Sequence, residues 1–385
     1  MRKTITTTIP LLLLLVTLSW IPATTAGASA VAPSFQPLAS CLAPGQATPV
    51  SPPAAKVAPK TASPIPASTP GAMNSSLLHM VADVPLPGSA SRFDYQSFDP
   101  ASGRLAIAHM GAGQLVVFDT RTRTVVGTVD HLPKATGVLA VPEVGEIFVS
   151  VAGDHQVAVV NDTTFKVVAR VGKIGFPDGL AYAPQAKRVF ISDEDGGGEL
   201  VVDARTNTVV TTIDIGGKAG NTHYDSISGC ILVAVQSRNQ LVAINPETAQ
   251  VVGRYAMAPG CDTPHGFLVD APGRLAFVTC EGNAKMLVVD LKTMQATAAL
   301  AVGVSPDVLA FDPGWHRLYV ASESGAVAVF DESRGVLQPL GTVTMADAHT
   351  IAVDPDTHLV YLPLANVHGR LVLRIMAPAP PAGAA

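Results

Sequence analysis

The chain has 385 residues, of which 48% are apolar, 14% charged and 5% aromatic, with 33 Gly, 31 Pro and 4 Cys. A chain so apolar and weakly charged is not typical of disordered proteins, and four cysteines are too few for a disulfide-based scaffold. Residues 1–82 contain no acid, so the remainder carries 30 acids against 21 bases. A surface of that sign disfavours nucleic acid and anionic membranes as partners.

The first thirty residues have the pattern of an export signal. Arg2 and Lys3 form a positive start, residues 11–21 are largely apolar, and Ala28-Ser29-Ala30 is a small-residue cleavage site. The apolar stretch is short for a bilayer span, and no later segment approaches ~20 apolar residues. We therefore expect a signal peptide over residues 1–30, no transmembrane span, and a periplasmic or secreted mature protein.

Residues 31–76 consist mostly of Ala, Pro, Ser, Thr, Val and Gly. Such a segment buries too little apolar surface to offset the ordering of its backbone, so we expect a disordered linker, and the same for residues 378–385. Leu38-Ala39-Ser40-Cys41 resembles a lipoprotein processing site that would place a lipid on Cys41. Because this box starts seventeen residues beyond the apolar stretch, lipidation is the less favoured alternative.

Residues 92–377 repeat at a nearly constant period. The segments 93–100, 177–184 and 306–313 share one motif, and its Asp position defines seven anchor residues separated by 42 residues, with one step of 45. The anchors are Asp94, Thr136, Asp178, Gly220, His265, Asp307 and His349. Each unit carries four short strand signals, which is the period of a propeller blade. The sequence thus predicts an all-β, seven-bladed β-propeller of four-stranded blades.

The seventh unit, which starts at His349, contains only three strand signals. The run from Leu77 to Pro85 is strand-like and belongs to no other unit. We expect it to complete the last blade, because pairing the two ends of the domain hides exposed strand edges. This predicts one propeller domain over residues 77–377, which we expect to be a monomer.

Variants of one tetrapeptide end the second strand of several units, as in Tyr319-Val320-Ala321-Ser322 and Phe277-Val278-Thr279-Cys280. Together with the Pro-Asp-x-x-x-x-x-Pro start of a unit and the Asp-x-x-Thr turn at 119–122, they resemble the YVTN-repeat propeller family of exported bacterial and archaeal proteins. The resemblance covers all seven blades and implies a scaffold without a single reaction. No Trp-Asp pair occurs, so WD40 and tryptophan-docked quinoprotein propellers match poorly.

Two rings of residues are expected at one mouth of the central channel. The anchors start the first strand of each blade, and residues 42 or 45 apart at the end of the second strand lie at the same end. The candidate ligand-binding residues are Asp94, Asp178, Glu194, Gln236, His265, Glu281, Asp307, Glu323 and His349. So many carboxylates at one opening call for a cation, hydrogen-bond donors or raised pKa values.

Oxygen ligands with one or two imidazoles suit calcium, manganese or zinc, so a divalent cation is a candidate cofactor. Its candidate ligands are His265, Glu281, Asp307, Glu323 and His349. The competing interpretation is architectural: an Asp at the start of each blade accepts hydrogen bonds from backbone amides, and the acids after the second strand are solvated.

Two cysteines fall in the fifth unit. Cys261 lies in the loop with the three extra residues, and Cys280 precedes Glu281 at the same mouth. In an oxidising compartment this proximity favours a disulfide worth roughly 3 kcal/mol, with a reduced pair or a thiolate metal site with His265 as alternatives. Cys230 starts the second strand of unit four, at the opposite end, where we expect a buried free thiol.

The chain lacks the complete sequence motifs of metalloproteases, α/β-hydrolases and phosphate-binding loops. The favoured function is therefore an exported, non-enzymatic propeller that binds a ligand or protein partner at the acidic mouth. One alternative is a metal-dependent, lactonase-like hydrolase in which a cation polarises a carbonyl. Another is a cell-surface structural or interaction protein.

Overall fold

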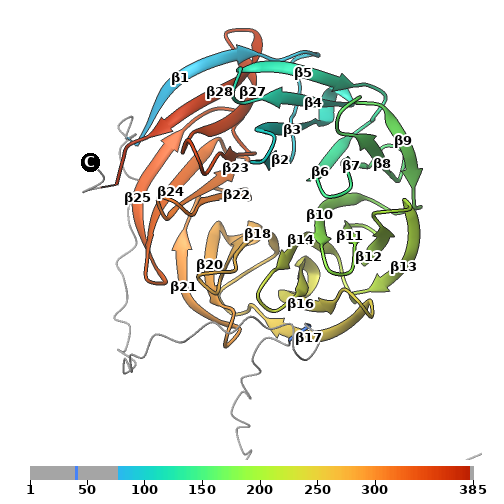
Figure 1. The fold of residues 1–385 in the computed structure, drawn as a ribbon. Coiled ribbons are helices and arrows are strands. Elements are labelled where there is room, and N and C mark those ends of the chain that lie inside the picture. The colour runs from blue at the N-terminus through green and yellow to red at the C-terminus, as the bar shows by residue number, and fades with distance from the viewer. Residues whose placement is uncertain (1–39, 42–76, 382–385) are drawn as a thin grey trace, which may run out of the picture. The chain divides into compact units, whose positions relative to one another are not determined.

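The computed structural model describes residues 40–41 and 77–381. Twenty-eight strands in this part of the chain form seven four-stranded antiparallel sheets. The sheets stand side by side around a common axis, each with its first strand innermost (Figure 1). The predicted all-β fold, a seven-bladed propeller of four-stranded blades, is confirmed.

The blades follow one another in chain order. Blade 1 contains β2 (Gln96–Asp99), β3 (Arg104–His109), β4 (Gln114–Asp119) and β5 (Thr124–Val129). Blade 2 contains β6 (Ala135–Val141), β7 (Glu146–Val151), β8 (Gln156–Asn161) and β9 (Val167–Val171). Blade 3 contains β10 (Pro177–Ala183), β11 (Arg188–Asp193), β12 (Gly198–Asp203) and β13 (Thr208–Asp214). Blade 4 contains β14 (Ala219–Asp225), β15 (Cys230–Val235), β16 (Gln240–Asn245) and β17 (Gln250–Ala256).

The remaining blades repeat the same plan. Blade 5 contains β18 (Pro264–Asp270), β19 (Leu275–Cys280), β20 (Lys285–Asp290) and β21 (Gln295–Ala301). Blade 6 contains β22 (Pro306–Asp312), β23 (Arg317–Ser322), β24 (Ala326–Ser333) and β25 (Val336–Thr344). Blade 7 contains β26 (Ala352–Val353), β27 (Val360–Val367), β28 (Arg370–Pro378) and β1 (Leu78–Pro85), in the sheet order β1-β28-β27-β26.

The burial of the strands explains why they can be recognised in the sequence. The second and third strands lie between neighbouring blades, so both of their faces are covered; every residue of β15 and β19 is buried. Such strands favour continuous runs of β-branched and other apolar residues. The fourth strand is outermost, and β5 accordingly alternates exposed and half-buried positions before its buried last residue.

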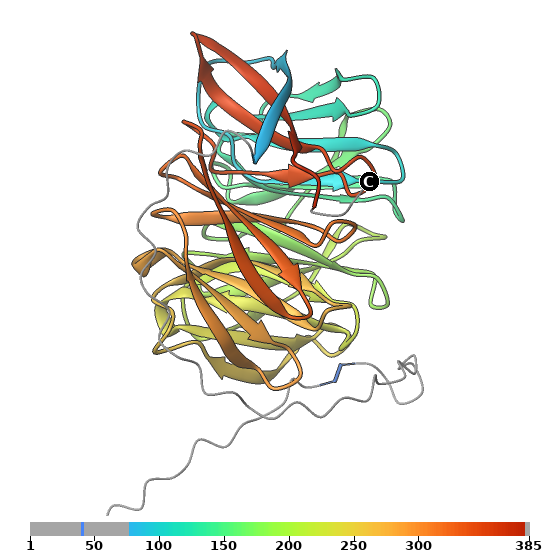
Figure 2. The same cartoon turned by 90° about the vertical axis from the view of Figure 1, so that its left-hand side faces the viewer.

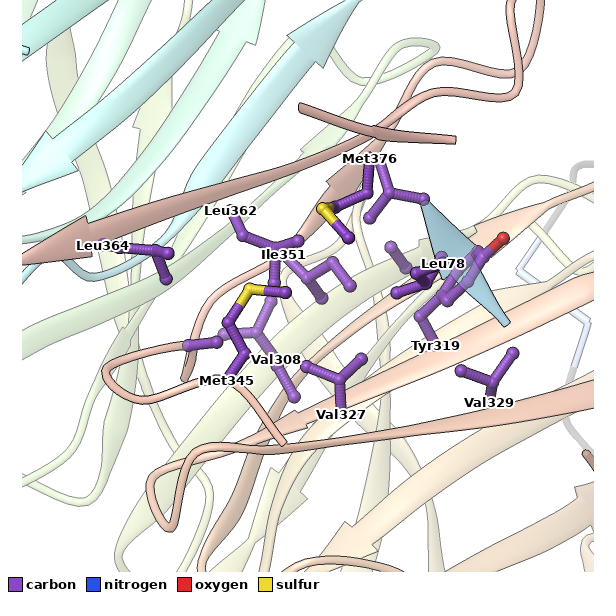
Figure 3. Close-up of a cluster of buried hydrophobic side chains, with 14 of the residues drawn as sticks. Leu78, Val308, Tyr319, Val327, Val329, Met345, Ile351, Leu362, Leu364 and Met376 are labelled. Carbon is purple, nitrogen blue, oxygen red and sulfur yellow. The ribbon is translucent and has the colours of Figure 1, made fainter. Parts of the chain in front are cut away.

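The two ends of the domain close the ring. β1 pairs antiparallel with β28 from Leu78, opposite Pro378, to Pro85, opposite Val372, and the two strands lie together in both views (Figures 1 and 2). Leu78 is buried in an apolar cluster with Tyr319 of blade 6 and with Met376 of blade 7 (Figure 3). The predicted closing role of this strand is confirmed.

The innermost strands approach one another closely at the channel mouth. A Cβ atom at Gly137 of β6 would lie 1.9 Å from the carbonyl oxygen of Asp178, and one at Gly266 of β18 would lie 1.7 Å from that of Asp307. Both distances are impossible for real atoms, so any side chain at these positions would push neighbouring blades apart. The glycines therefore let the next anchor residue come close to the axis.

Two disulfides tie down loops on opposite ends of the propeller. Cys261 and Cys280 are bonded, as predicted, and this removes both the reduced pair and the thiolate metal site. The prediction of a free thiol at Cys230 is wrong: its sulfur is bonded to Cys41, and the Cys41 N–H donates to the Ser228 carbonyl at 2.8 Å. A sulfur in a disulfide is not available for a lipid, so the alternative of lipidation at Cys41 is also contradicted.

The helices in the described ranges are three short 3-10 turns: η1 (Met110–Ala112), η2 (Gln236–Arg238) and η3 (Glu281–Asn283). Within residues 40–41 and 77–381 we find no helix with the length and apolarity that a membrane crossing requires. The predicted signal peptide, and nearly all of the predicted linker, lie outside the described residues.

Candidate functional site

Five ionisable anchor residues come together at one mouth of the channel. Asp178, His265 and Asp307 lie on the innermost strands β10, β18 and β22, while Asp94 and His349 lie two and three residues before the first strands of blades 1 and 7. We call these five residues the mouth cluster. They come from five different blades, and only the ring arrangement brings them close together. The other two anchors, Thr136 and Gly220, carry no charge.

The cluster is densest around Asp307. His265 Nε2 lies 3.5 Å from Asp307 Oδ1, and His349 Nε2 lies 3.8 Å from Asp307 Oδ2. The Tyr95 hydroxyl donates to Asp307 Oδ1 at 3.3 Å. On the other side, His349 Nε2 is 3.7 Å from Asp94 Oδ1. Asp94 and Asp307 thus flank one imidazole nitrogen at distances beyond hydrogen-bond reach.

Burial shapes the charge state of the carboxyls. It raises the pKa of Asp94, and the negative charge of Asp307 adds to that shift. Burial also raises the pKa of Asp178 well above its usual range, with Asp94 and Glu194 contributing in the same direction. Burial alone would raise the pKa of Asp307 too, but the rings of His265 and His349 outweigh it and lower that pKa. Asp307 is therefore the carboxylate that the site holds ionised.

His265 is poised between two partners. Burial by itself lowers its pKa, but the ion pair with Asp307 and the charge of Asp178 raise the pKa to about 10, which favours the protonated ring. Its Nδ1 lies 2.9 Å from the Gln236 amide nitrogen, which also lies 2.7 Å from the Ala219 carbonyl oxygen. An amide nitrogen only donates, so this contact suits a ring that accepts at Nδ1. The Gln236 contact therefore favours the neutral ring of His265, whereas the charge of Asp307 favours its imidazolium form.

The predicted second ring lies mostly on the rim of the mouth. Gln236 reaches the cluster through His265, and it also donates to Glu194 at 3.1 Å. Glu194 pairs with Lys218 at 2.9 Å, and Glu323 pairs with Arg92 at 2.7 Å. Among the described residues, no hydrogen bond or ion pair joins the Glu281 side chain to the cluster, although its charge contributes to the raised pKa of His265.

Sequence reasoning missed Tyr95, Arg92 and Lys218. A signal for the first existed, because the position after the anchor is Gly in three blades and Tyr95 breaks that pattern. Its hydroxyl orients Asp307, and burial raises its own pKa well above the usual range. Arg92 and Lys218 each lie two residues before an anchor, and Lys134 occupies the same position in blade 2, so a repeated basic residue there was a further signal.

The hydrogen bonds of the Asp anchors give little support to the architectural interpretation. Within the described chain, no backbone N–H donates to the carboxylates of Asp94, Asp178 or Asp307. Hydroxyl groups make the backbone contacts near the axis instead: Thr136 Oγ1 donates to the Pro177 carbonyl and Ser150 Oγ to the Asp178 carbonyl, each at 2.7 Å. The carboxylates are thus available for other partners.

One subset of the cluster has the donor arrangement of a cation site. Asp94, Asp307 and His349 each offer a ligand atom, and these atoms lie within 4.8 Å of one another. Two carboxylates and one imidazole are a donor set that Zn²⁺ and Mn²⁺ accept. Of the five ligands predicted from sequence, Asp307 and His349 belong to this subset, whereas Asp94 was absent from that prediction.

Comparison with known proteins identifies the architecture. No family model and no curated protein matches the chain. Among solved structures, a chain of hydrazine synthase from Kuenenia stuttgartiensis superposes with a TM-score of 0.64 at 15% identity, covering 76% of this chain and 97% of that one. At that identity the likeness shows the fold alone. Fold and site together define a seven-bladed β-propeller with an acidic, histidine-containing mouth.

Proposed function

We propose that this protein is an exported, non-enzymatic β-propeller whose mouth cluster binds a ligand or a protein partner. Propellers are general binding scaffolds, and the resemblance to the YVTN-repeat family supports such a role outside the cytoplasm. The two disulfides are consistent with an extracytoplasmic protein.

One observation carries the proposal. Asp94 Oδ1 and His349 Nε2 are buried, and neither has a hydrogen-bond partner among the described residues. Burying a polar atom without a partner costs about 1 to 3 kcal/mol, so a structure retains such atoms where a function uses them. A ligand that enters the mouth and contacts both atoms recovers that free energy.

The charges indicate the chemistry of the ligand. Burial raises the pKa of Asp94 and Asp178, so a group that carries positive charge or several N–H donors would stabilise their ionised forms and is favoured there. On the rim, the Arg92–Glu323 and Lys218–Glu194 pairs offer both signs of charge to the outer part of a ligand or to a protein loop. These exposed pairs contribute orientation more than affinity.

A thermal-shift titration tests the proposal with arginine, spermidine and choline as cationic probes and glucose as a neutral one. We expect at least one cationic probe to raise the melting temperature of the wild type, and the shift to disappear in Asp307→Asn. The matched control is Asp154→Asn, which removes an exposed ion pair with Arg170 outside the cluster. Equal shifts in all three proteins, or none in the wild type, would contradict binding of a cationic ligand in the mouth.

A metal-dependent, lactonase-like hydrolase is the second candidate. The observation that favours it is Asp178, a buried carboxyl with a raised pKa in the same cluster as the cation donors. A carboxyl with a raised pKa is the kind of group that serves as a general acid or base. Hydrolysis of γ-butyrolactone by the wild type with added Mn²⁺, abolished in Asp178→Asn, would support it; no turnover with any divalent ion would reject it.

A further inference from the structure

We propose that Asp94, Asp307 and His349 bind one divalent transition-metal ion, with Zn²⁺ and Mn²⁺ preferred over Ca²⁺. This rests on the proposed role of the mouth, and it names the first ligand that the mouth takes. The three residues come from blades 1, 6 and 7, which meet at the ring closure. The ion would therefore join the first and last blades.

The distances fit ligands that share an ion. His349 Nε2 lies 3.7 Å from Asp94 Oδ1 and 3.8 Å from Asp307 Oδ2. These separations are too long for hydrogen bonds, yet donor atoms about 2.1 Å from a common ion lie roughly 3 to 4 Å apart. His349 is 7% exposed and Asp94 is 3% exposed, and their facing atoms have no hydrogen-bond partner within the described residues.

Asp307 is oriented so that one oxygen remains available. Its Oδ1 accepts from the Tyr95 hydroxyl at 3.3 Å and lies 3.5 Å from His265 Nε2. Its Oδ2 faces His349. Partners behind a ligand fix its direction and are a regular feature of metal sites. Tyr95 and His265 are thus positioning residues, and Oδ2 is the oxygen directed toward the ion.

The donor set decides which ion is preferred. Ca²⁺ takes six to eight oxygen ligands, whereas this site offers two carboxylates and an imidazole nitrogen. Imidazole nitrogen suits Zn²⁺ and also first-row ions such as Mn²⁺ when carboxylates accompany it. Three protein ligands leave coordination positions open, which a ligand of the mouth could occupy.

Isothermal titration calorimetry of the purified protein with ZnCl2, MnCl2 and CaCl2 tests the site. We expect one equivalent of Zn²⁺ or Mn²⁺ to bind the wild type, with Ca²⁺ at least tenfold weaker. Asp94→Asn and His349→Gln should each weaken binding at least tenfold. The matched control, Asp154→Asn, removes an exposed carboxylate that pairs with Arg170 outside the cluster and should bind the ions like the wild type.

A second measurement needs only the wild type, so it remains decisive if the variants fail to fold. In a protein with 13C-labelled histidine, substoichiometric Mn²⁺ should broaden the ring signals of His349 first and leave those of His79, exposed on β1, sharp. Broadening of His79 before His349, no uptake by the wild type, or uptake unchanged in both ligand variants would overturn the site; His265, which lies 3.5 Å from Asp307, should broaden together with His349. If no ion binds but a cationic organic probe still does, the metal site fails and the proposed role of the mouth stands.

Discussion

The closure of the ring by β1 can be tested with a single side chain. Leu78 is 3% exposed and packs against blades 6 and 7, whereas Met80, two residues later on the same strand, is 63% exposed. Leu78→Ala deletes buried methyl groups without changing the backbone pairing of β1 with β28. This change also leaves Cys41 and its disulfide in place, which a truncation through β1 would not.

The expected cost follows from the burial of Leu78. Replacing a buried Leu by Ala typically destabilises a protein by 2 to 5 kcal/mol, so we expect about 3 kcal/mol here. For a domain of roughly 300 residues the entropy of unfolding is about 0.6 kcal/mol per kelvin, which converts 3 kcal/mol to a fall of about 5 °C in melting temperature.

Calorimetry and urea unfolding of the two variants provide the assay. Met80→Ala should change the free energy of unfolding by less than about 0.5 kcal/mol, because the side chain is largely in solvent already. If Leu78→Ala melts within 1 °C of Met80→Ala, the packing of β1 on its neighbours does not hold the ring closed and the reasoning fails.

Two further changes probe the interior and the N-terminal attachment. Glu199 is fully buried on β12 with neither carboxyl oxygen hydrogen-bonded in the described structure, and burial raises its pKa well above the usual value. The stability that this group contributes is therefore greatest below its pKa in the unfolded chain, and it falls as the pH rises toward its pKa in the folded protein. Glu199→Gln should be more stable than the wild type at pH 8, and most of that difference should be lost at pH 4.5. A difference in urea midpoint that does not depend on pH would contradict this. Cys230→Ser breaks the disulfide to Cys41, which spans 189 residues, and should cost up to about 5 kcal/mol. Alkylation of the denatured, unreduced protein should modify no cysteine in the wild type and one in the variant, and two modified cysteines in the wild type would show that the bond is absent.

The periodicity of the sequence was enough to predict the fold. Each blade needs the same two buried middle strands and the same turns, so the 42-residue period and the continuous apolar runs recur in the sequence of every unit. The missing strand of the seventh unit and the unassigned run before the first then identified the closure. The Cys261–Cys280 disulfide was also predictable, because one blade holds both residues close together.

Other contacts depended on distances that no local pattern encodes. Cys41 lies in a segment without periodicity, so nothing in the sequence paired it with Cys230. The burial of Glu199, by contrast, follows from the repeat, because the equivalent residues Leu115, Val157 and Leu241 are apolar and fully buried.

The site shows the same division between sequence and structure. The sequence alone determined that carboxyl and imidazole groups gather at one mouth, because in-phase repeats place equivalent residues at equivalent heights. Only the tertiary structure decided which of them meet. Residues at the start of the innermost strands, such as Asp94, Asp307 and His349, converge near the axis. Glu323 instead follows a second strand about 4.8 Å farther out and pairs with Arg92 on the rim.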